Sequence, residues 1–312
     1  MPKNAPRMEA LADALNALGT AYQRKGDFDD AKRAYDKSVE VGLLLNDTYV
    51  GRSKQSLGGL CMHFEKLDDA LRHLQESREC YERGLGKDNV RVAHPYHHMA
   101  KIYLQQAEGC EGERQISLLS DAKANAKKAF EIRDRGFMKG SGEKLKDESK
   151  KLLEEIELKF AIYDKETELG KDDVGVSELY HNMAKRYMEQ GRLGEAEKHA
   201  RKALDIREEG FDLGEGEEVK EESARLLREI QGLSEIQKKE QELGKDDVLV
   251  AHAYHNMAKI YLEQGRLKEA EANAKKALEI REGGYAPGSG EALKEESRRL
   301  MREIQGEIAS GG

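Results

Sequence analysis

Residues 250–280 read VAHAYHNMAKIYLEQGRLKEAEANAKKALEI, and this stretch decides the fold. Apolar residues such as Tyr254, Met257 and Ala258 recur at intervals of three and four before Gly265, and the same spacing resumes after it. This is the period of an amphipathic helix and not the alternation of a strand. Glycine lets a chain turn without a Cβ clash. The stretch therefore predicts two antiparallel helices joined at Gly265, a helical hairpin.

The hairpin sequence is repeated along the chain. YHNMAK begins at Tyr254 and also at Tyr180, 74 residues earlier. A third, more divergent copy has YHHMAK from Tyr96 and carries about ten extra residues after Gln106. Repetition at a fixed period is typical of arrays in which each helical unit buries its apolar face against its neighbours.

The composition agrees with an array of exposed helices. Of 312 residues, 37% are charged, 38% are hydrophobic and only 6% are aromatic, with no Trp, so a single large core is not expected. The net charge of -8 argues against a nucleic-acid or anionic-membrane binder, whose footprint is basic. No apolar run approaches the roughly 20 residues of a membrane helix.

The cysteines and the N-terminal sequence favour a cytoplasmic protein. Cys61, Cys80 and Cys110 lie at irregular spacing, which indicates neither a disulfide framework nor a zinc site and suits a reducing compartment. The sequence MPKNAPRMEA contains no apolar segment of the kind found in signal peptides. Cys61 stands where other repeats have a packing aromatic, so we interpret it as a small buried hydrophobe.

The repeats share most of one pattern: a large residue followed by Gly or Ala, then Tyr, a turn of the form Gly-x-Leu or Gly-x-Phe, and Ala in the second helix. The matching residues include Leu18, Gly19, Tyr22, Gly26, Phe28 and Ala31, then Leu57, Gly58 and Ala70, then Met99, Ala100 and Tyr103, then Met183, Ala184, Tyr187, Gly191 and Ala196, and finally Met257, Ala258, Tyr261, Gly265 and Ala270. This pattern resembles the tetratricopeptide repeat. The linking strings LGKDN from Leu85 and LGKDD from Leu169 and Leu243 resemble the kinesin light chain subclass.

The resemblance implies an all-α, right-handed superhelical solenoid of antiparallel helix pairs. We expect one solenoid over residues 8–307, followed by a flexible tail, 308–312. The good repeats are expected at about 12–45, 51–84, 93–136, 177–210 and 251–284. Degenerate repeats, each a tight hairpin or one bent helix, are expected at about 143–168 and 217–242, with a capping helix at 291–307.

The resemblance also implies a function and a site. In tetratricopeptide solenoids the first helix of each hairpin lines a concave groove, so this chain is expected to be a non-enzymatic adaptor or scaffold that binds a peptide segment there. Cofactors, metal ions and nucleic acids are not expected. The groove residues implied by the repeat positions are Asn16, Arg24, Arg52, Gln55, His63, His94, His97, Lys101, His181, Asn182, Lys185, His255, Asn256 and Lys259. His and Lys in register would suit acidic side chains or a C-terminal carboxylate.

The sequence leaves two alternative functions open and contains one short motif that needs an interpretation. The chain could be a structural subunit that self-associates through the edges of its solenoid. The other alternative is a metal-dependent enzyme that uses His94, His97 and His98, which would require these side chains to converge on one ion with a supporting second shell. Three Gly-x-Gly strings each precede a helix, but a Glu follows each one and would repel phosphate, so we interpret them as loops and caps.

Overall fold

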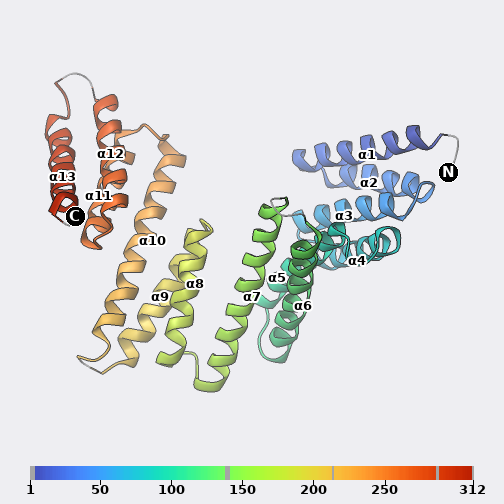
Figure 1. The fold of residues 1–312 in the computed structure, drawn as a ribbon, viewed down its shortest axis with the longest axis horizontal. Helices are drawn as coiled ribbons and strands as arrows, with labels where there is room; N and C mark the ends of the chain where they lie inside the picture. The colour runs from blue at the N-terminus through green and yellow to red at the C-terminus, as the bar shows by residue number, and fades with distance from the viewer. Residues whose placement is uncertain (1–3, 138–140, 213, 286–287, 311–312) are drawn as a thin grey trace. The chain divides into compact units, whose positions relative to one another are not determined.

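The computed structural model describes residues 4–137, 141–212, 214–285 and 288–310. Within these ranges all regular secondary structure is helical, with thirteen α-helices, one short 3-10 helix and no strand (Figure 1). The all-α prediction is confirmed. The chain divides into two compact units, residues 1–163 and 164–312, and each is described by itself. A single solenoid over residues 8–307 stays a prediction.

The N-terminal unit consists of three helical hairpins and most of the long helix that follows them. Its elements are α1 (Ala5–Lys25), α2 (Phe28–Leu43), α3 (Asp47–His63), α4 (Leu67–Leu85), a 3-10 helix (Val90–Val92), α5 (Ala93–Glu108), α6 (Glu113–Gly136) and α7 (Glu143–Leu169). The pairs α1/α2, α3/α4 and α5/α6 pack as hairpins. The extra residues after Gln106 lengthen α6 to 24 residues.

The C-terminal unit consists of two hairpins, each followed by a long helix. Its elements are α8 (Val174–Glu189), α9 (Leu193–Gly210), α10 (Glu217–Leu243), α11 (Val248–Glu263), α12 (Leu267–Gly284) and α13 (Glu291–Ser310). The predicted degenerate repeats are single continuous helices, α7 and α10, of 27 residues each, which decides between the two alternatives. The last helix continues to Ser310, so the predicted tail from residue 308 is wrong where it is described; residues 311 and 312 lie outside the described part.

The hairpin turns explain the glycine of the repeat pattern. Gly26, Gly191 and Gly265 have φ values of 84°, 73° and 70°, in the left-handed region that a Cβ disfavours. The second hairpin has Glu65 at this position with φ 57°, and among the described residues it is the one non-glycine residue with positive φ. That turn therefore stores backbone strain that the other hairpins lack.

Replacing Glu65 by glycine should stabilise the protein. An L-residue in the left-handed region costs about 1–2 kcal/mol, and the greater freedom of glycine in the unfolded chain returns part of it. We expect Glu65→Gly to raise the free energy of unfolding by about 0.5–1 kcal/mol, measured by urea denaturation. The reverse change at Gly26, Gly26→Glu, should lower it. A destabilised Glu65→Gly variant would contradict the strain.

The linking strings form the joints between one long helix and the next hairpin. Gly170 and Gly244 end α7 and α10 with φ values of 100° and 89°. Three residues later, the carboxylates of Asp173 and Asp247 accept hydrogen bonds of 2.8 Å from the backbone N–H groups of Gly175 and Leu249. A left-handed glycine followed by an Asp N-cap stops one helix and starts the next.

The core is a series of thin layers and not one large centre. In the last hairpin, Ala258, Ala270 and Ala274 are buried between α11 and α12, and Ile236 of α10 and Leu300 of α13 complete the cluster. Alanine at these crossings lets helix axes approach closely. Cys61 is buried among apolar residues of the second hairpin, and burial raises the pKa of its thiol, as expected for a structural cysteine.

The Gly-x-Gly strings have a packing role. A Cβ on Gly216 would lie 2.5 Å from the ring of Phe211, and one on Gly290 would lie 2.5 Å from the ring of Tyr285. An aromatic ring therefore lies flat against each glycine before the next helix begins. This supports the interpretation as loops. Gly140, the first residue of one string, lies outside the described residues.

Candidate partner-binding surface

The predicted site residues come from the first helices of the hairpins, but they do not all face solvent. Seven are exposed: Arg24, Arg52, His63, Lys101, Asn182, Lys185 and Lys259. Three are half-buried: Gln55, His94 and Asn256. Four are buried: Asn16, His97, His181 and His255. The groove assignment stays a prediction, and the four buried side chains have little accessible surface with which to contact a ligand.

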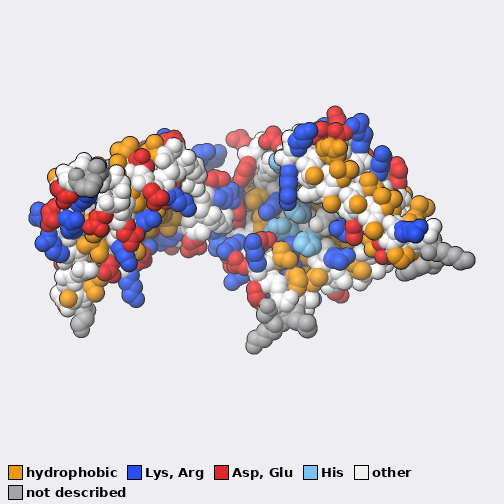
Figure 2. All heavy atoms as spheres, turned by 90° about the horizontal axis from the view of Figure 1, so that it is seen from above, with side chains coloured by type: hydrophobic (Ala, Val, Ile, Leu, Met, Phe, Trp, Pro, Cys, Tyr) orange, Lys and Arg blue, Asp and Glu red, His pale blue; other side chains and the backbone are white. Residues whose placement is uncertain are grey.

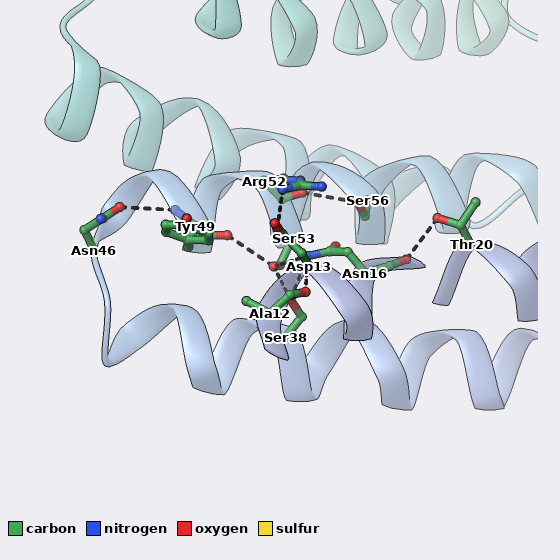
Figure 3. A network of polar contacts seen from close by, with 10 residues as sticks. All are labelled: Ala12, Asp13, Asn16, Thr20, Ser38, Asn46, Tyr49, Arg52, Ser53 and Ser56. Carbon is green, nitrogen blue, oxygen red and sulfur yellow. Dashed lines mark hydrogen bonds and ion pairs between the residues drawn. The ribbon is translucent and has the colours of Figure 1, made fainter. Parts of the chain in front are cut away.

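Asn16 is buried because its amide joins three helices (Figure 3). Its Nδ2, which carries two hydrogens, lies within hydrogen-bonding distance of three acceptors: the carbonyl of Ala12 at 3.1 Å, Ser38 Oγ at 2.7 Å and Ser53 Oγ at 3.1 Å. The two hydroxyls lie 2.8 Å apart, on α2 and α3. Buried amides need such partners, so Asn16 acts as a packing residue of the first three helices.

Above this network, two of the predicted residues already have partners within the chain. Arg52 on α3 donates to the carboxylate of Asp13 on α1 (Figure 3). Gln55 accepts a hydrogen bond of 3.3 Å from the hydroxyl of Tyr81. Any ligand of this surface would compete with these contacts or use the free donors of Gln55.

Each of the last three hairpins and the long helix after it form a block of three helices: α5/α6/α7, α8/α9/α10 and α11/α12/α13. In the first two blocks the histidine at the equivalent repeat position contacts a serine hydroxyl of the third helix, whereas neither ring nitrogen of His255 has a hydrogen-bond partner among the described residues. The Nδ1 of His97 lies 3.3 Å from Ser149 Oγ, and the Nδ1 of His181 lies 3.2 Å from Ser223 Oγ. Burial lowers the pKa of His97 to about 2 and that of His255 to about 4, and it also lowers the pKa of His181. These imidazoles are neutral at physiological pH, so they supply no positive charge to a ligand.

A buried arginine lies at the centre of each such site. Arg207, at the end of α9, donates from Nη1 to the carbonyl of Val219 at 2.8 Å and to Ser223 Oγ at 2.7 Å. Its Nε donates to Ser177 Oγ on α8 at 3.1 Å. One guanidinium therefore links all three helices of the block, α8, α9 and α10.

The contacts with the third helix recur in the other two blocks, but the contact with a serine of the first helix does not, because Ala93 and Ala251 stand where Ser177 does. Arg133 donates to the carbonyl of Leu145 at 2.9 Å and to Ser149 at 2.7 Å. Arg281 donates to the carbonyl of Leu293 at 2.7 Å and to Ser297 at 2.8 Å. We call these three sets of contacts the arginine joints; each guanidinium is at most 4% exposed.

The residues of the arginine joints recur at a regular spacing in the sequence, and this spacing could have predicted them. Arg133, Arg207 and Arg281 are separated by 74 residues, as are Ser149, Ser223 and Ser297. An arginine next to the last apolar residue of a helix is normally interpreted as a solvated side chain. Only its exact repetition together with a serine sixteen residues later distinguishes it.

Two of the three lysines that were predicted to line a groove form ion pairs within the protein. In the C-terminal unit Lys185 Nζ lies 3.1 Å from Glu222 Oε1, and Lys259 Nζ lies 3.7 Å from Glu296 Oε1. The same carboxylate oxygens lie 3.2 Å from the Nε2 atoms of His181 and His255. A carboxylate of the chain itself thus occupies the position between lysine and histidine in both hairpins.

The N-terminal unit differs at this point. Glu148 holds the sequence position of Glu222 and Glu296, yet within the described residues Lys101 makes no ion pair with it or with any other carboxylate. Instead, Arg133 Nη2 lies 3.3 Å from His94 Nδ1. Figure 2 shows imidazoles gathered on this face of the unit beside Lys and Arg side chains. The positive charge of Lys101 is therefore available to a ligand.

The described part of the chain contains neither a candidate metal-binding cluster nor a candidate membrane-spanning helix. No group of three or more His, Cys, Asp or Glu side chains has an arrangement that could hold a metal ion there. None of the described helices combines the length and apolar character needed to cross a bilayer.

Comparison with known families identifies the repeats. Family models described as tetratricopeptide repeat match residues 12–41, 176–212 and 236–283. This chain is a tetratricopeptide repeat protein. Proteins built from these repeats are of the protein–protein interaction scaffold type, typically bind protein partners and are typically non-enzymatic. None of the curated proteins matches this tetratricopeptide repeat chain.

Solved structures with helical repeats are also similar to it. BtubC (BKLC) from P. vanneervenii is 17% identical over 90% of this chain and 85% of its own, with a TM-score of 0.36. Two structures of nearly identical TPR-like repeats from a Podosopora anserina kinesin light chain are 12% identical. They cover 90% and 86% of this chain and 97% and 93% of their own, with TM-scores of 0.35 and 0.34. Likenesses at this level do not decide the subclass, for which the linking strings remain the basis.

Proposed function

We propose that this tetratricopeptide repeat protein is an adaptor that binds a peptide segment of a partner protein on the first-helix surface of its N-terminal unit. The observation that carries the proposal is the uncompensated charge of Lys101. Its equivalents Lys185 and Lys259 already face Glu222 and Glu296, whereas Lys101 has no carboxylate partner among the described residues.

The neutral histidines and buried arginines give this surface a rigid base. In the C-terminal unit, Ser223 accepts from Arg207 and can donate its own hydrogen to Nδ1 of His181, which leaves the imidazole proton on Nε2. His97 has the equivalent contact with Ser149. An acidic group of the peptide would lie near Lys101 and the Nε2–H of His97, as the Glu222 carboxylate does in the second unit. Charge-assisted hydrogen bonds of this kind are roughly twice as strong as neutral ones.

The exposed polar residues would add contacts to the peptide backbone. Asn182 and Asn256 stand on the corresponding face of α8 and α11, where an amide can both donate to and accept from an extended chain. We place them in a secondary role, because the lysine beside each of them is already paired.

A matched pair of charge reversals tests this proposal. We expect Lys101→Glu to weaken binding of a captured partner peptide at least about tenfold, because it replaces the unpaired cation by a repelling charge. Lys185→Glu, on the equivalent position of α8, should weaken it less than about threefold if the second unit contributes only secondary contacts. Fluorescence anisotropy with the peptide measures both, after partner capture and mapping have supplied it.

Circular dichroism and thermal unfolding of both variants control for folding, since both side chains are exposed. Equal effects of the two reversals, or a larger effect of Lys185→Glu, would contradict the assignment to the N-terminal unit. No effect of either would contradict binding on the first-helix surface.

A further inference from the structure

The first helix of the chain presents an apolar face with no cover. Leu11 and Leu18 on α1 are 50% and 46% exposed. The other positions of this face are also exposed, and all are alanine: Ala10, Ala14, Ala17 and Ala21. Figure 2 views the unit from the side of α1 in Figure 1 and shows a continuous patch of hydrophobic side chains over that helix.

In the other repeats of the chain, the residues at the positions of Leu11 and Leu18 are buried. The residues equivalent to Leu18 are at most 2% exposed: Leu57, Met99, Met183 and Met257. The residues equivalent to Leu11 are at most 6% exposed: Val50, Val92, Val176 and Val250. α1 therefore carries the side chains of an internal repeat at a position where the described chain provides nothing to cover them.

In the other hairpins a helix of the same chain covers this face. Tyr35 and Val39 of α2 pack with Leu57. In the C-terminal unit, Leu233 and Ile236 of α10 pack with Met257. The natural occupant of such a face is thus another amphipathic helix that offers large apolar side chains three or four residues apart.

We propose that two copies of this chain associate through α1, each covering the face of the other. The face from Ala10 to Ala21 contains no charged residue, so its partner surface must be apolar too. Among the described residues, the other large apolar side chains with comparable exposure lie in the first or last turn or two of their helices or just beyond: Leu43, Leu44, Leu85, Ile116, Leu169, Leu243, Leu249, Leu293 and Ile308. The apolar helix surface that matches α1 in length is α1 itself.

The spacing within α1 suits a two-fold axis. Leu11 and Leu18 lie two helical turns apart, so an antiparallel pair centred near Ala14 brings Leu11 of each copy beside Leu18 of the other. The alanines between them allow the helix axes to approach closely. An interface of this kind closes on itself and forms a dimer, not a fibre.

The charges at the two ends of the apolar face predict how dimer formation depends on salt concentration. Arg7 and Lys25 flank it and are both exposed and positive. In an antiparallel pair these ends of the two copies lie near each other, so their repulsion opposes association. Salt screens such repulsion and also favours apolar burial. We therefore expect association to strengthen as the salt concentration rises, whereas a contact held by ion pairs would weaken.

Sedimentation equilibrium of the full chain tests the proposal. We expect the wild-type protein to form a dimer whose dissociation constant falls as salt is raised from about 50 to 500 mM. Leu11→Glu and Leu18→Glu should each raise that constant at least about tenfold, because each buries a carboxylate in the interface. Leu43→Glu, at the exposed end of α2, is the matched control and should leave it unchanged.

Cross-linking tests the geometry separately. In a Cys110→Ser background, Ala14→Cys should form a disulfide between copies under mild oxidation, whereas Ala21→Cys, away from the axis, should not. A wild-type monomer at all concentrations, growth into open-ended oligomers, or dimers that survive both glutamate substitutions would overturn the proposal. Unchanged circular dichroism of the variants excludes misfolding as the cause of dissociation.

Discussion

Arg207→Ala is expected to lower the free energy of unfolding by about 3 kcal/mol, although the residue touches no predicted ligand. The substitution removes the donor shared by the Val219 carbonyl and the hydroxyls of Ser177 and Ser223. Leaving buried acceptors without a donor costs about 1–3 kcal/mol for each group. It also opens a cavity where α8, α9 and α10 meet. Urea denaturation followed by circular dichroism measures the change.

Two variants make this result specific. Arg201→Ala removes an exposed arginine of the same helix, paired with Glu197 at 2.9 Å, and should change stability by less than about 0.5 kcal/mol. Arg207→Lys keeps the charge but offers one nitrogen where the structure uses a planar fork, so it should recover little. A loss for Arg207→Ala no larger than that for Arg201→Ala would show that the arginine joint is dispensable.

The second large effect is acid destabilisation of the N-terminal unit. Burial lowers the pKa of His97 to about 2 and that of His98 to about 4, from an ordinary value of 6.5, and Arg133, Lys101 and His94 add to the effect. The unfolded chain binds protons at these histidines below pH 6.5, whereas the folded chain does not. Their contribution to stability is therefore complete above pH 6.5 and is lost as the pH falls towards 4 for His98 and lower for His97.

The size of this effect follows from linkage. When the pKa of a histidine falls from 6.5 to about 4 on folding, the free energy of unfolding of the protein decreases by about 2 kcal/mol between pH 7 and pH 5. We expect urea titrations at several pH values to show this slope, and His98→Gln to reduce it by about that amount. His63→Gln, which removes an exposed imidazole, is the control. A slope that is the same in the wild type and in His98→Gln would refute the assignment.

Much of the fold could be predicted because its signals are local and repeated. The spacing around Met257 and Ala258, the turn at Gly265 and the recurrence of YHNMAK specify hairpins without knowledge of tertiary structure. The long helices could not be settled in the same way. Their sequences are helical throughout, and whether a helix bends back depends on a turn residue, so Gly232, which lies inside α10 against Met257, was as consistent with a hairpin as with a straight helix.

The candidate site was predicted less well, because family positions give the face of a helix but not what packs over it. The positions of His97, His181 and His255 were correct for first helices, yet the third helix of each block covers them. The pairing of Lys185 and Lys259 depends on Glu222 and Glu296, which lie 37 residues further along the chain. No local pattern reports such a contact, and none distinguishes Lys101 from its two equivalents.

The arginine joints bear on how a chain of this kind can change in length. The contact of Arg207 with Ser223 and the contact of Arg281 with Ser297 are interchangeable, since each joins a second helix to the long helix that follows it. A copy of residues 217–290 inserted after residue 290 would meet the same chemistry at both ends. Evolution or an engineer could therefore lengthen this protein by whole blocks without inventing a new interface, while an insertion of any other length would have to build one.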